Sequence, residues 1–152
     1  MLQAKLILTP VDFSDSALDA VETAADLASR LGAVLLLVHI VPALPKLPAD
    51  VSIFKEGEYE QRLHEHAVGR IAELAARYEQ TGISVRSEVG VANDVGMEIL
   101  RVAKKHEADL IVIATHGVTG WKELAFGSIA EKVVRLAHSP VLVLRAPPGP
   151  KH

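Results

Sequence analysis

Residues 108–145 read ADLIVIATHGVTGWKELAFGSIAEKVVRLAHSPVLVLR, and this stretch decides the fold class. Its first apolar run, at residues 110–114, predicts a buried strand, and a loop with three glycines follows. Gly127 and Ser128 then open a helix, and residues 141–144 (VLVL) predict a last strand. Free N–H groups at a helix start, reached through a flexible glycine loop, are typical of a phosphate site. The alternative is a helix start with a glycine cap and no ligand.

The rest of the chain repeats this alternation. Residues 5–9, 33–40 and 83–89 predict three further strands, the last of them at a sheet edge because apolar and polar side chains alternate. Apolar residues at helical spacing predict a helix after each strand, and Gly32 is expected to end the first helix. Residues 42–57, with three prolines, are interpreted as a long loop and a candidate lid.

Strands that alternate with helices predict βαβ crossovers and a mostly parallel sheet. We expect an α/β fold that is doubly wound and Rossmann-like, with five strands in the order 3-2-1-4-5 and four flanking helices. Residues 1–146 form the expected domain, and residues 147–152 a disordered tail. The strand order reverses between the first and fourth strands, and ligands bind outside the carboxyl ends of such strands. The loops expected there are residues 10–14 and 115–126.

Composition narrows the function classes. The 152 residues are 49% hydrophobic but 4% aromatic, so the core must be built mostly from Val, Ile, Leu and Ala. The chain has no cysteine, which excludes disulfides, thiolate catalysis and cysteine-ligated metals. Its net charge is −3 without a basic run, which argues against a nucleic-acid partner. No segment approaches the roughly 20 apolar residues of a membrane helix, so we expect a cytoplasmic protein with no membrane partner.

Two side chains at the expected crevice are candidates for ligand contacts. Asp12 follows the first strand, where a carboxylate can bond a ribose hydroxyl or help to hold a metal ion near phosphates. Its alternative role is a turn or helix cap. His116 lies between the fourth strand and Gly117, in one of the two expected crevice loops, and its alternative role is a loop histidine that bonds the backbone. The residue before Ser128 is not the lysine of a Walker motif, and no nucleophile elbow is present, which favours binding over catalysis.

The chain resembles the universal stress protein family over nearly its whole length. The matching segments are LILTPVDFSDSA (6–17), LLLVHIVP (35–42), VGVANDVGMEIL (89–100) and the block at 108–145. Nucleotide-binding members carry Gly, two residues, Gly, nine residues, Gly, then Ser or Thr. Here Ala114, Gly117, Gly127 and Ser128 match that pattern except for alanine at the first position.

The resemblance implies a site for ATP, or for ADP or AMP, with Mg²⁺ or Mn²⁺ at the phosphates and Asp12 as a candidate metal ligand. On matching positions, the adenosine would contact Pro10, Val11, Asp12 and the backbone of Ile40. The ribose and phosphates would contact Ile113, Ala114, His116 and Gly117. The phosphate end would be held by Gly127, Ser128 and Ile129. The methyl group of Ala114 would crowd the site if the ligand requires glycine-only backbone angles or very close approach there. The resemblance also implies a homodimer through residues 141–144, an exposed apolar edge in the expected strand order.

Three functions remain open at this point. The first is a nucleotide-responsive stress protein that changes its surface toward regulatory protein partners when ATP binds. The second is a slow ATPase, or a protein that phosphorylates itself at Ser128 or a nearby hydroxyl. The third is a nucleotide-free adaptor whose dimer surface carries the function.

Overall fold

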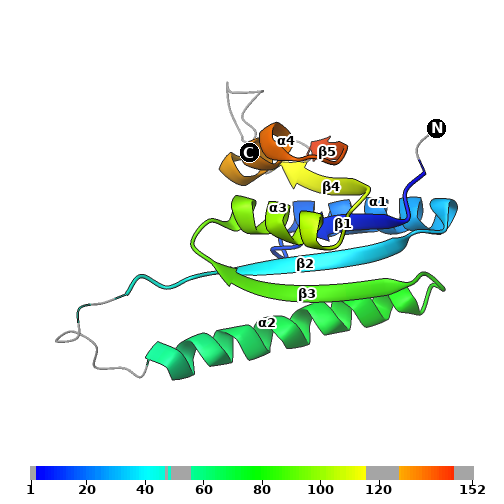
Figure 1. The fold of residues 1–152 in the computed structure, drawn as a ribbon. Helices are drawn as coiled ribbons and strands as arrows, with labels where there is room; N and C mark the ends of the chain where they lie inside the picture. Colours follow the sequence, from blue (N-terminus) through cyan, green and yellow to red (C-terminus); the bar gives the residue numbers. More distant parts are fainter. Residues whose placement is uncertain (1–2, 47, 49–55, 116–126, 146–152) are drawn as a thin grey trace, which may run out of the picture.

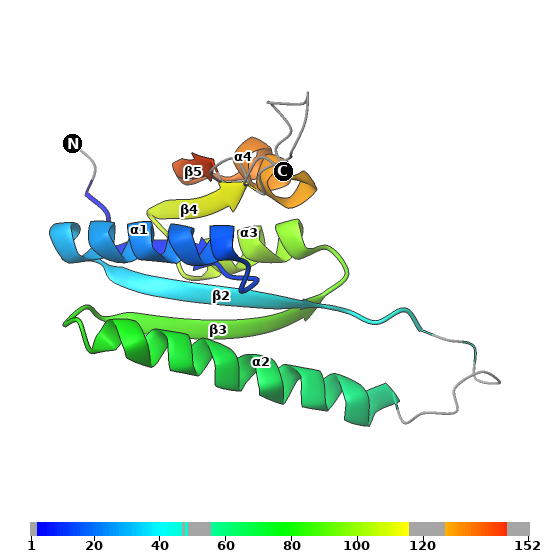
Figure 2. The same cartoon turned by 180° about the vertical axis from the view of Figure 1, so that it is seen from behind.

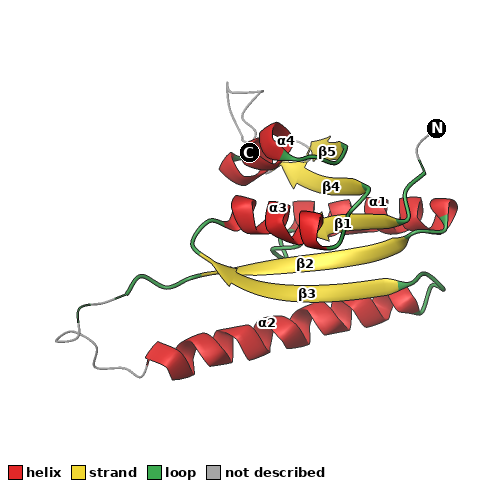
Figure 3. Cartoon of the chain, viewed as in Figure 1, coloured by secondary structure: helices red, strands yellow, loops and turns green. Residues whose placement is uncertain are grey.

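The fold is a single parallel sheet flanked by helices. A computed structural model of the protein describes residues 3–46, 48, 56–115 and 127–145. Within these ranges strands and helices alternate along the chain (Figures 1 and 3). In chain order they are β1 (Leu6–Pro10), α1 (Asp15–Leu31), β2 (Val34–Pro42), α2 (Glu56–Glu79), β3 (Val85–Ala92), α3 (Val95–Lys105), β4 (Leu110–Thr115), α4 (Ser128–Leu136) and β5 (Val141–Arg145). The sheet order is β3-β2-β1-β4-β5, and each neighbouring pair is parallel. The predicted fold and strand order are confirmed.

Two hydrophobic cores lie on opposite faces of the sheet, because alternate strand residues point to opposite sides. Ile7 of β1 belongs to the core with Val21 of α1 and Ile71 of α2. Its neighbour Leu8 belongs to the other core, with Val102 of α3. The two opposite views show α3 in front of the sheet in Figure 1 and α1 in front of it in Figure 2. The central strands are covered on both sides, which explains their nearly continuous apolar runs.

Local sequence sets both ends of α1. Ser14 is the N-cap residue, and its Oγ accepts a hydrogen bond from the Ala17 N–H at 3.3 Å. At the other end Gly32 adopts the left-handed conformation, with φ of 65°, and its N–H bonds the carbonyl of Ala28. The predicted terminating glycine is confirmed, and the cap at the start of the helix is Ser14 rather than Asp12.

Several element boundaries differ from the prediction. The apolar spacing indicates the second helix from Leu63, whereas α2 begins at Glu56, and β3 runs from Val85 to Ala92 rather than over 83–89. The first turns of α2 project beyond the sheet (Figure 1), so they need no apolar face and show no periodicity. Half of the candidate lid (residues 47 and 49–55) and the tail 147–152 lie outside the described residues. No helix in the described ranges is long and apolar enough to cross a membrane.

The sheet opens between β1 and β4. Their ladder contains two residue pairs and ends at Leu8 and Ile111. Beyond it β1 continues along β2 as far as Pro10, while β4 continues along β5 as far as Thr115. Pro10 has no N–H group and so cannot donate a ladder hydrogen bond to β4. The carboxyl ends of the two strands therefore diverge at the reversal of strand order, where a ligand crevice was predicted.

Candidate functional site

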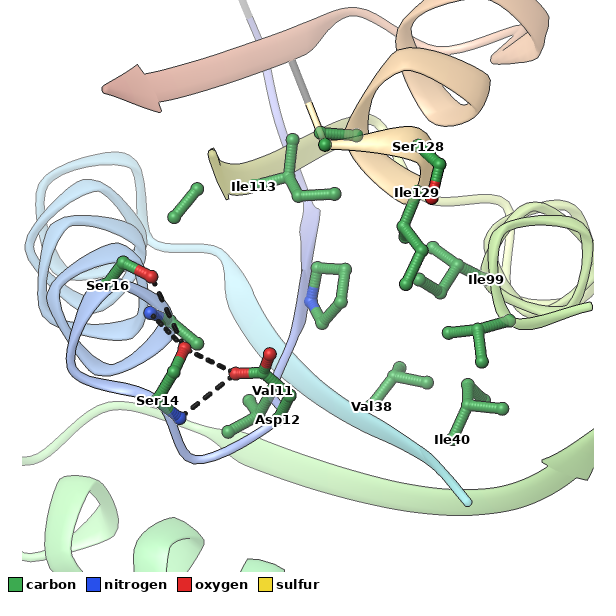
Figure 4. Close-up of a pocket in the computed structure, with 16 residues that line it drawn as sticks. Val11, Asp12, Ser14, Ser16, Val38, Ile40, Ile99, Ile113, Ser128 and Ile129 are labelled. Carbon is green, nitrogen blue, oxygen red and sulfur yellow. Dashed lines mark hydrogen bonds between the residues drawn. The ribbon is translucent and has the colours of Figure 1, made fainter. Parts of the chain in front are cut away.

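A cavity of about 180 Å³ lies where β1 and β4 diverge. Its walls come from the carboxyl ends of three strands and from the first turns of α1, α3 and α4 (Figure 4). The lining residues are Pro10, Val11, Asp12, Ser14, Ser16, Ala17, Val38, Ile40, Val95, Ile99, Ile113, Ala114, Gly127, Ser128, Ile129 and Ala130. Three helix starts thus surround one hollow.

Nine of the residues singled out in the sequence line this cavity together. They are Pro10, Val11, Asp12, Ile40, Ile113, Ala114, Gly127, Ser128 and Ile129. The other two, His116 and Gly117, lie outside the described residues. Figure 4 shows Asp12 and Ser128 on opposite sides of the cavity, Asp12 in the loop before α1 and Ser128 at the start of α4. All four sequence segments that carry the family resemblance contribute residues to this cavity.

Asp12 is part of an ordered turn at one side of the cavity. Its Oδ1 accepts hydrogen bonds from the Ser14 N–H at 3.0 Å and from the Ser14 Oγ at 2.5 Å. The Ser14 Oγ also lies 3.3 Å from the Ser16 Oγ. The carboxylate and the two hydroxyls are thereby fixed side by side (Figure 4). The N-cap of α1 is Ser14, and Asp12 holds that capping residue in place.

The start of α4 differs from the starts of the other two helices. Ser14 caps α1, and Asp94 caps α3 by accepting a hydrogen bond from the Met97 N–H at 3.0 Å. The N-cap of α4 is Gly127, and no side-chain capping bond is present there among the described residues. N–H groups in the first turn of a helix have no intrahelical acceptor and carry partial positive charge. The α4 start, with Ser128, is therefore the end of the cavity that suits an anion.

An ion pair holds α3 and α4 at their places in the cavity wall. Lys132 Nζ of α4 lies 2.5 Å from Asp94 Oδ2, just before α3. The hydrogen bond from Lys132 holds the pKa of the Asp94 carboxyl below its usual range. The stem of Lys132 also packs over Gly96, because a Cβ added there would lie 3.0 Å from its Cδ. These contacts fix the distance between the two helix starts.

The remaining wall of the cavity is apolar. Val38 and Ile40 contribute from β2, and Val95 and Ile99 from α3 (Figure 4). An apolar hollow with a few polar groups at its ends is typical of sites for cofactors. Sequence reasoning missed three of these four residues and named Ile40 for its backbone alone. The signal was available, because Val38 shares a strand face with Ile40, and Ile99 lies one turn after Val95.

Comparison with known proteins identifies the family. The profile of the Universal stress protein family matches residues 4–145. The chain belongs to this family. Universal stress protein MJ0531 of Methanocaldococcus jannaschii is 34% identical over 147 residues, which cover 94% of this chain and 83% of that protein. The solved structure of protein MJ0577 from the same organism has a TM-score of 0.78 at 26% identity, and the match covers 97% of this chain and 99% of that one.

Two further solved structures of the universal stress protein family show the same fold. One is in complex with cAMP and has a TM-score of 0.65 at 21% identity. The match covers 95% of this chain and 98% of the chain in that structure. The other, from Archaeoglobus fulgidus, is in complex with dAMP and has a TM-score of 0.60 at 21% identity, with 94% and 98% covered. At this identity the likeness establishes the fold alone.

Ala114 is where this universal stress protein departs from the glycine pattern of the family's nucleotide-binding members. It lies within β4 and pairs with Leu144 of β5. In the described part of the chain, the non-glycine residues with positive φ are Phe13 and Glu107. The backbone at Ala114 is therefore ordinary strand, and the alanine does not occupy a glycine-only conformation.

A metal ion would find one carboxylate in the described wall of the cavity, that of Asp12. No cluster of three or more metal-ligating side chains occurs in the described ranges. Mg²⁺ typically keeps several waters and binds through one or two carboxylates together with ligand phosphates. The residues present fit an ion that arrives with a phosphate-bearing ligand, rather than a metal site built by the protein.

Proposed function

We propose that this universal stress protein binds an adenine nucleotide, ATP or its shorter forms ADP and AMP, in the cavity between β1 and β4. The observation that carries the proposal is that one cavity combines three different surfaces. An apolar wall with Val38 and Ile99 suits a base, the fixed carboxylate of Asp12 suits ribose hydroxyls, and the start of α4 suits phosphates.

Charge determines the orientation of the proposed ligand. Asp12 is negative and disfavours phosphate oxygens beside it, whereas the first turn of α4 is electropositive. The phosphates should therefore point to Gly127 and Ser128, with the base against β2 and α3. The repulsion by Asp12 applies to phosphates without a metal ion. An accompanying Mg²⁺ or Mn²⁺ ion would neutralise part of the phosphate charge and lie between the phosphates and the Asp12 carboxylate, its candidate protein ligand.

Other members of the family support the ligand class. The two solved relatives described above hold cAMP and dAMP, and both ligands are adenine nucleotides. Their fold is the fold of this chain, which supports an adenine nucleotide as the class of ligand. ATP is the finer proposal for this chain and rests on its own cavity.

We place the protein among regulatory binding proteins of the stress response rather than among enzymes. The polar side chains in the described cavity wall are Asp12 and three serines, and this set includes no histidine or lysine that could activate water. Ligand binding would join the starts of α1, α3 and α4 around one molecule. The surface that these helices present to protein partners would change with ligand occupancy, and the protein would act as a homodimer through β5.

Calorimetric titration of nucleotide-stripped protein with ATP and Mg²⁺ tests the proposal, with ADP, AMP and cAMP in parallel. We expect one site per chain. No heat for any nucleotide, together with an unshifted melting temperature, would contradict the proposal and leave the nucleotide-free adaptor.

Ser128→Glu tests the placement of the phosphates. We expect ATP affinity to fall by roughly ten-fold or more, because two unit charges 4 Å apart repel by about 1 kcal/mol in water and about 4 kcal/mol near a protein surface. Ser29→Glu is the matched control, since Ser29 is exposed near the far end of α1 and the charge change is the same. Equal affinities for the two variants would exclude phosphates at the α4 start.

A further inference from the structure

Phe13 has an unusual backbone conformation beside the cavity. Its φ is 63°, in the left-handed region that bulky side chains rarely adopt. It stands between Asp12 and Ser14, which both line the cavity, while Phe13 itself does not. Conformations of this kind persist only where surrounding contacts over-determine them, and they cluster at functional sites.

The Phe13 side chain is held on two sides. Its ring centroid lies 5.1 Å from that of His39 on β2, with the planes tilted by 56°. The guanidinium of Arg70 on α2 lies over the same ring, with its Cζ 4.0 Å from the centroid. A cation over an aromatic face is attracted by the negative charge density of the ring. Phe13 is therefore clamped between a strand and a helix that are distant in sequence.

The same histidine also holds the residue on the other side of Asp12. His39 Nδ1 bonds the carbonyl oxygen of Val11. Both neighbours of Asp12 are thus tied to β2, one through its backbone and one through its ring. With the bonds from Ser14 to the Asp12 carboxylate, the orientation of Asp12 is determined from three directions. If φ at Phe13 became negative, the chain after Phe13 would turn the other way, and Ser14 would no longer lie where it bonds the Asp12 carboxylate.

We propose that Phe13 is a positioning residue for the ligand site, and that the Arg70 cation on α2 holds its ring so that Asp12 faces the ligand. The inference rests on the proposed nucleotide function. It extends the site beyond the cavity wall to α2, because the exposed Arg70 contacts Phe13, the neighbour of Asp12.

The experiment measures ATP affinity by calorimetry and the ligand-free melting temperature, for Arg70→Gln, Arg70→Lys, Phe13→Ala and Phe13→Tyr. We expect Arg70→Gln to weaken ATP binding by about two- to five-fold, the equivalent of an exposed cation–π contact. The ligand-free melting temperature should fall by only about 1–4 °C, because the same contact is present without ligand. Arg70→Lys keeps the cation and Phe13→Tyr keeps the ring, so both should retain most of the affinity. Arg62→Gln, an exposed arginine of the same helix, is the matched control and should bind as the wild type does.

A double-mutant comparison separates positioning from general destabilisation. Phe13→Ala should weaken binding strongly in the wild type but add nothing in an Asp12→Ala background, because the two changes act through one group. An equal loss in both backgrounds, or equal affinities for Arg70→Gln and Arg62→Gln, would overturn the inference while the proposed function stands. Absence of ATP binding by the wild type would overturn both. If Phe13→Ala fails to fold, the Arg70 variants still decide the question.

Discussion

Thr9 carries a buried hydroxyl immediately before the residues that line the cavity. Its side chain is fully buried in β1, and its Oγ1 has no hydrogen-bond partner among the described residues. A buried polar group without a partner costs about 1–3 kcal/mol, whereas an apolar group of the same shape avoids that cost. Thr9→Val should therefore raise the free energy of unfolding by about 1 kcal/mol, as measured by urea denaturation.

Thr115→Val is the matched control for this prediction. Thr115 is also buried in a central strand, but its hydroxyl donates a hydrogen bond to the Leu144 carbonyl at 3.4 Å. The same substitution should bring no gain there, because a hydrogen bond is lost. A loss of stability in Thr9→Val would show that its hydroxyl does have a partner in the folded protein.

Single residues also show where sequence reasoning reaches its limit. Asp12 and Ser128 were predictable as parts of one site, because strand order brings the loops after parallel strands to the same edge of the sheet. The clamp on Phe13 was not, because no local pattern predicts a left-handed phenylalanine. Its conformation depends on His39 and Arg70, which only the tertiary fold brings to it. The ligand roles of the site residues stay predictions until binding is measured.

At the scale of elements, Glu88 connects the edge strand β3 to the end of α3. Its Oε1 accepts a hydrogen bond from Lys105 Nζ at 3.0 Å, and its Oε2 pairs with His106 Nε2. Partial burial raises the pKa of the Glu88 carboxyl, but the hydrogen bonds and charges of His106 and Lys105 outweigh burial and bring that pKa below its ordinary value. The contacts with Lys105 and His106 therefore favour the ionised carboxylate of Glu88 in the folded state.

This shift makes an acid-sensitive contact. A carboxyl whose pKa is lower in the folded state adds stability above its unfolded pKa, and that stability is lost as the pH falls through the folded pKa. We expect Glu88→Gln to lower the free energy of unfolding by about 1 kcal/mol at neutral pH. The difference in free energy of unfolding between Glu88→Gln and the wild type should disappear as the pH drops below about 4.3, the ordinary pKa of a glutamate side chain.

Denaturant unfolding at a series of pH values measures that gap. Glu73→Gln, at an exposed position of α2, is the control and should leave the profile of the wild type unchanged. A gap between wild type and Glu88→Gln that stays constant in acid would mean that the contact does not depend on the ionised carboxylate.

The elements themselves were largely readable from the chain. Apolar runs located the strands because the central ones are buried on both faces, and Gly32 ended α1 where predicted. The first residue of α2 could not be predicted from the sequence, because the first turns of this helix extend beyond the sheet and bury little apolar surface. There a local bond from Gln61 to Glu65 at 3.0 Å supports the helix instead of core packing.

For the whole molecule, the sheet has two exposed edges that differ in character. β3 forms one edge and carries charged side chains such as Arg86 and Glu88. β5 forms the other edge with the sequence VLVLR, and Leu142 is 37% exposed there. An apolar edge strand offers unpaired N–H and C=O groups to another strand, whereas charges on an edge discourage pairing. A twofold interface through β5 would cover this edge with its own copy.

Light scattering on the eluting protein tests this homodimer. We expect the wild type at twice its chain mass of 16.3 kDa and Leu142→Lys at 16.3 kDa, because a charged side chain on an edge strand discourages pairing with another strand. Val91→Lys is the matched control, since Val91 is 47% exposed on the opposite edge strand, and it should remain dimeric. A wild type that elutes as a monomer at every concentration would contradict the interface. A dimer that survives Leu142→Lys would place the contact elsewhere on the molecule.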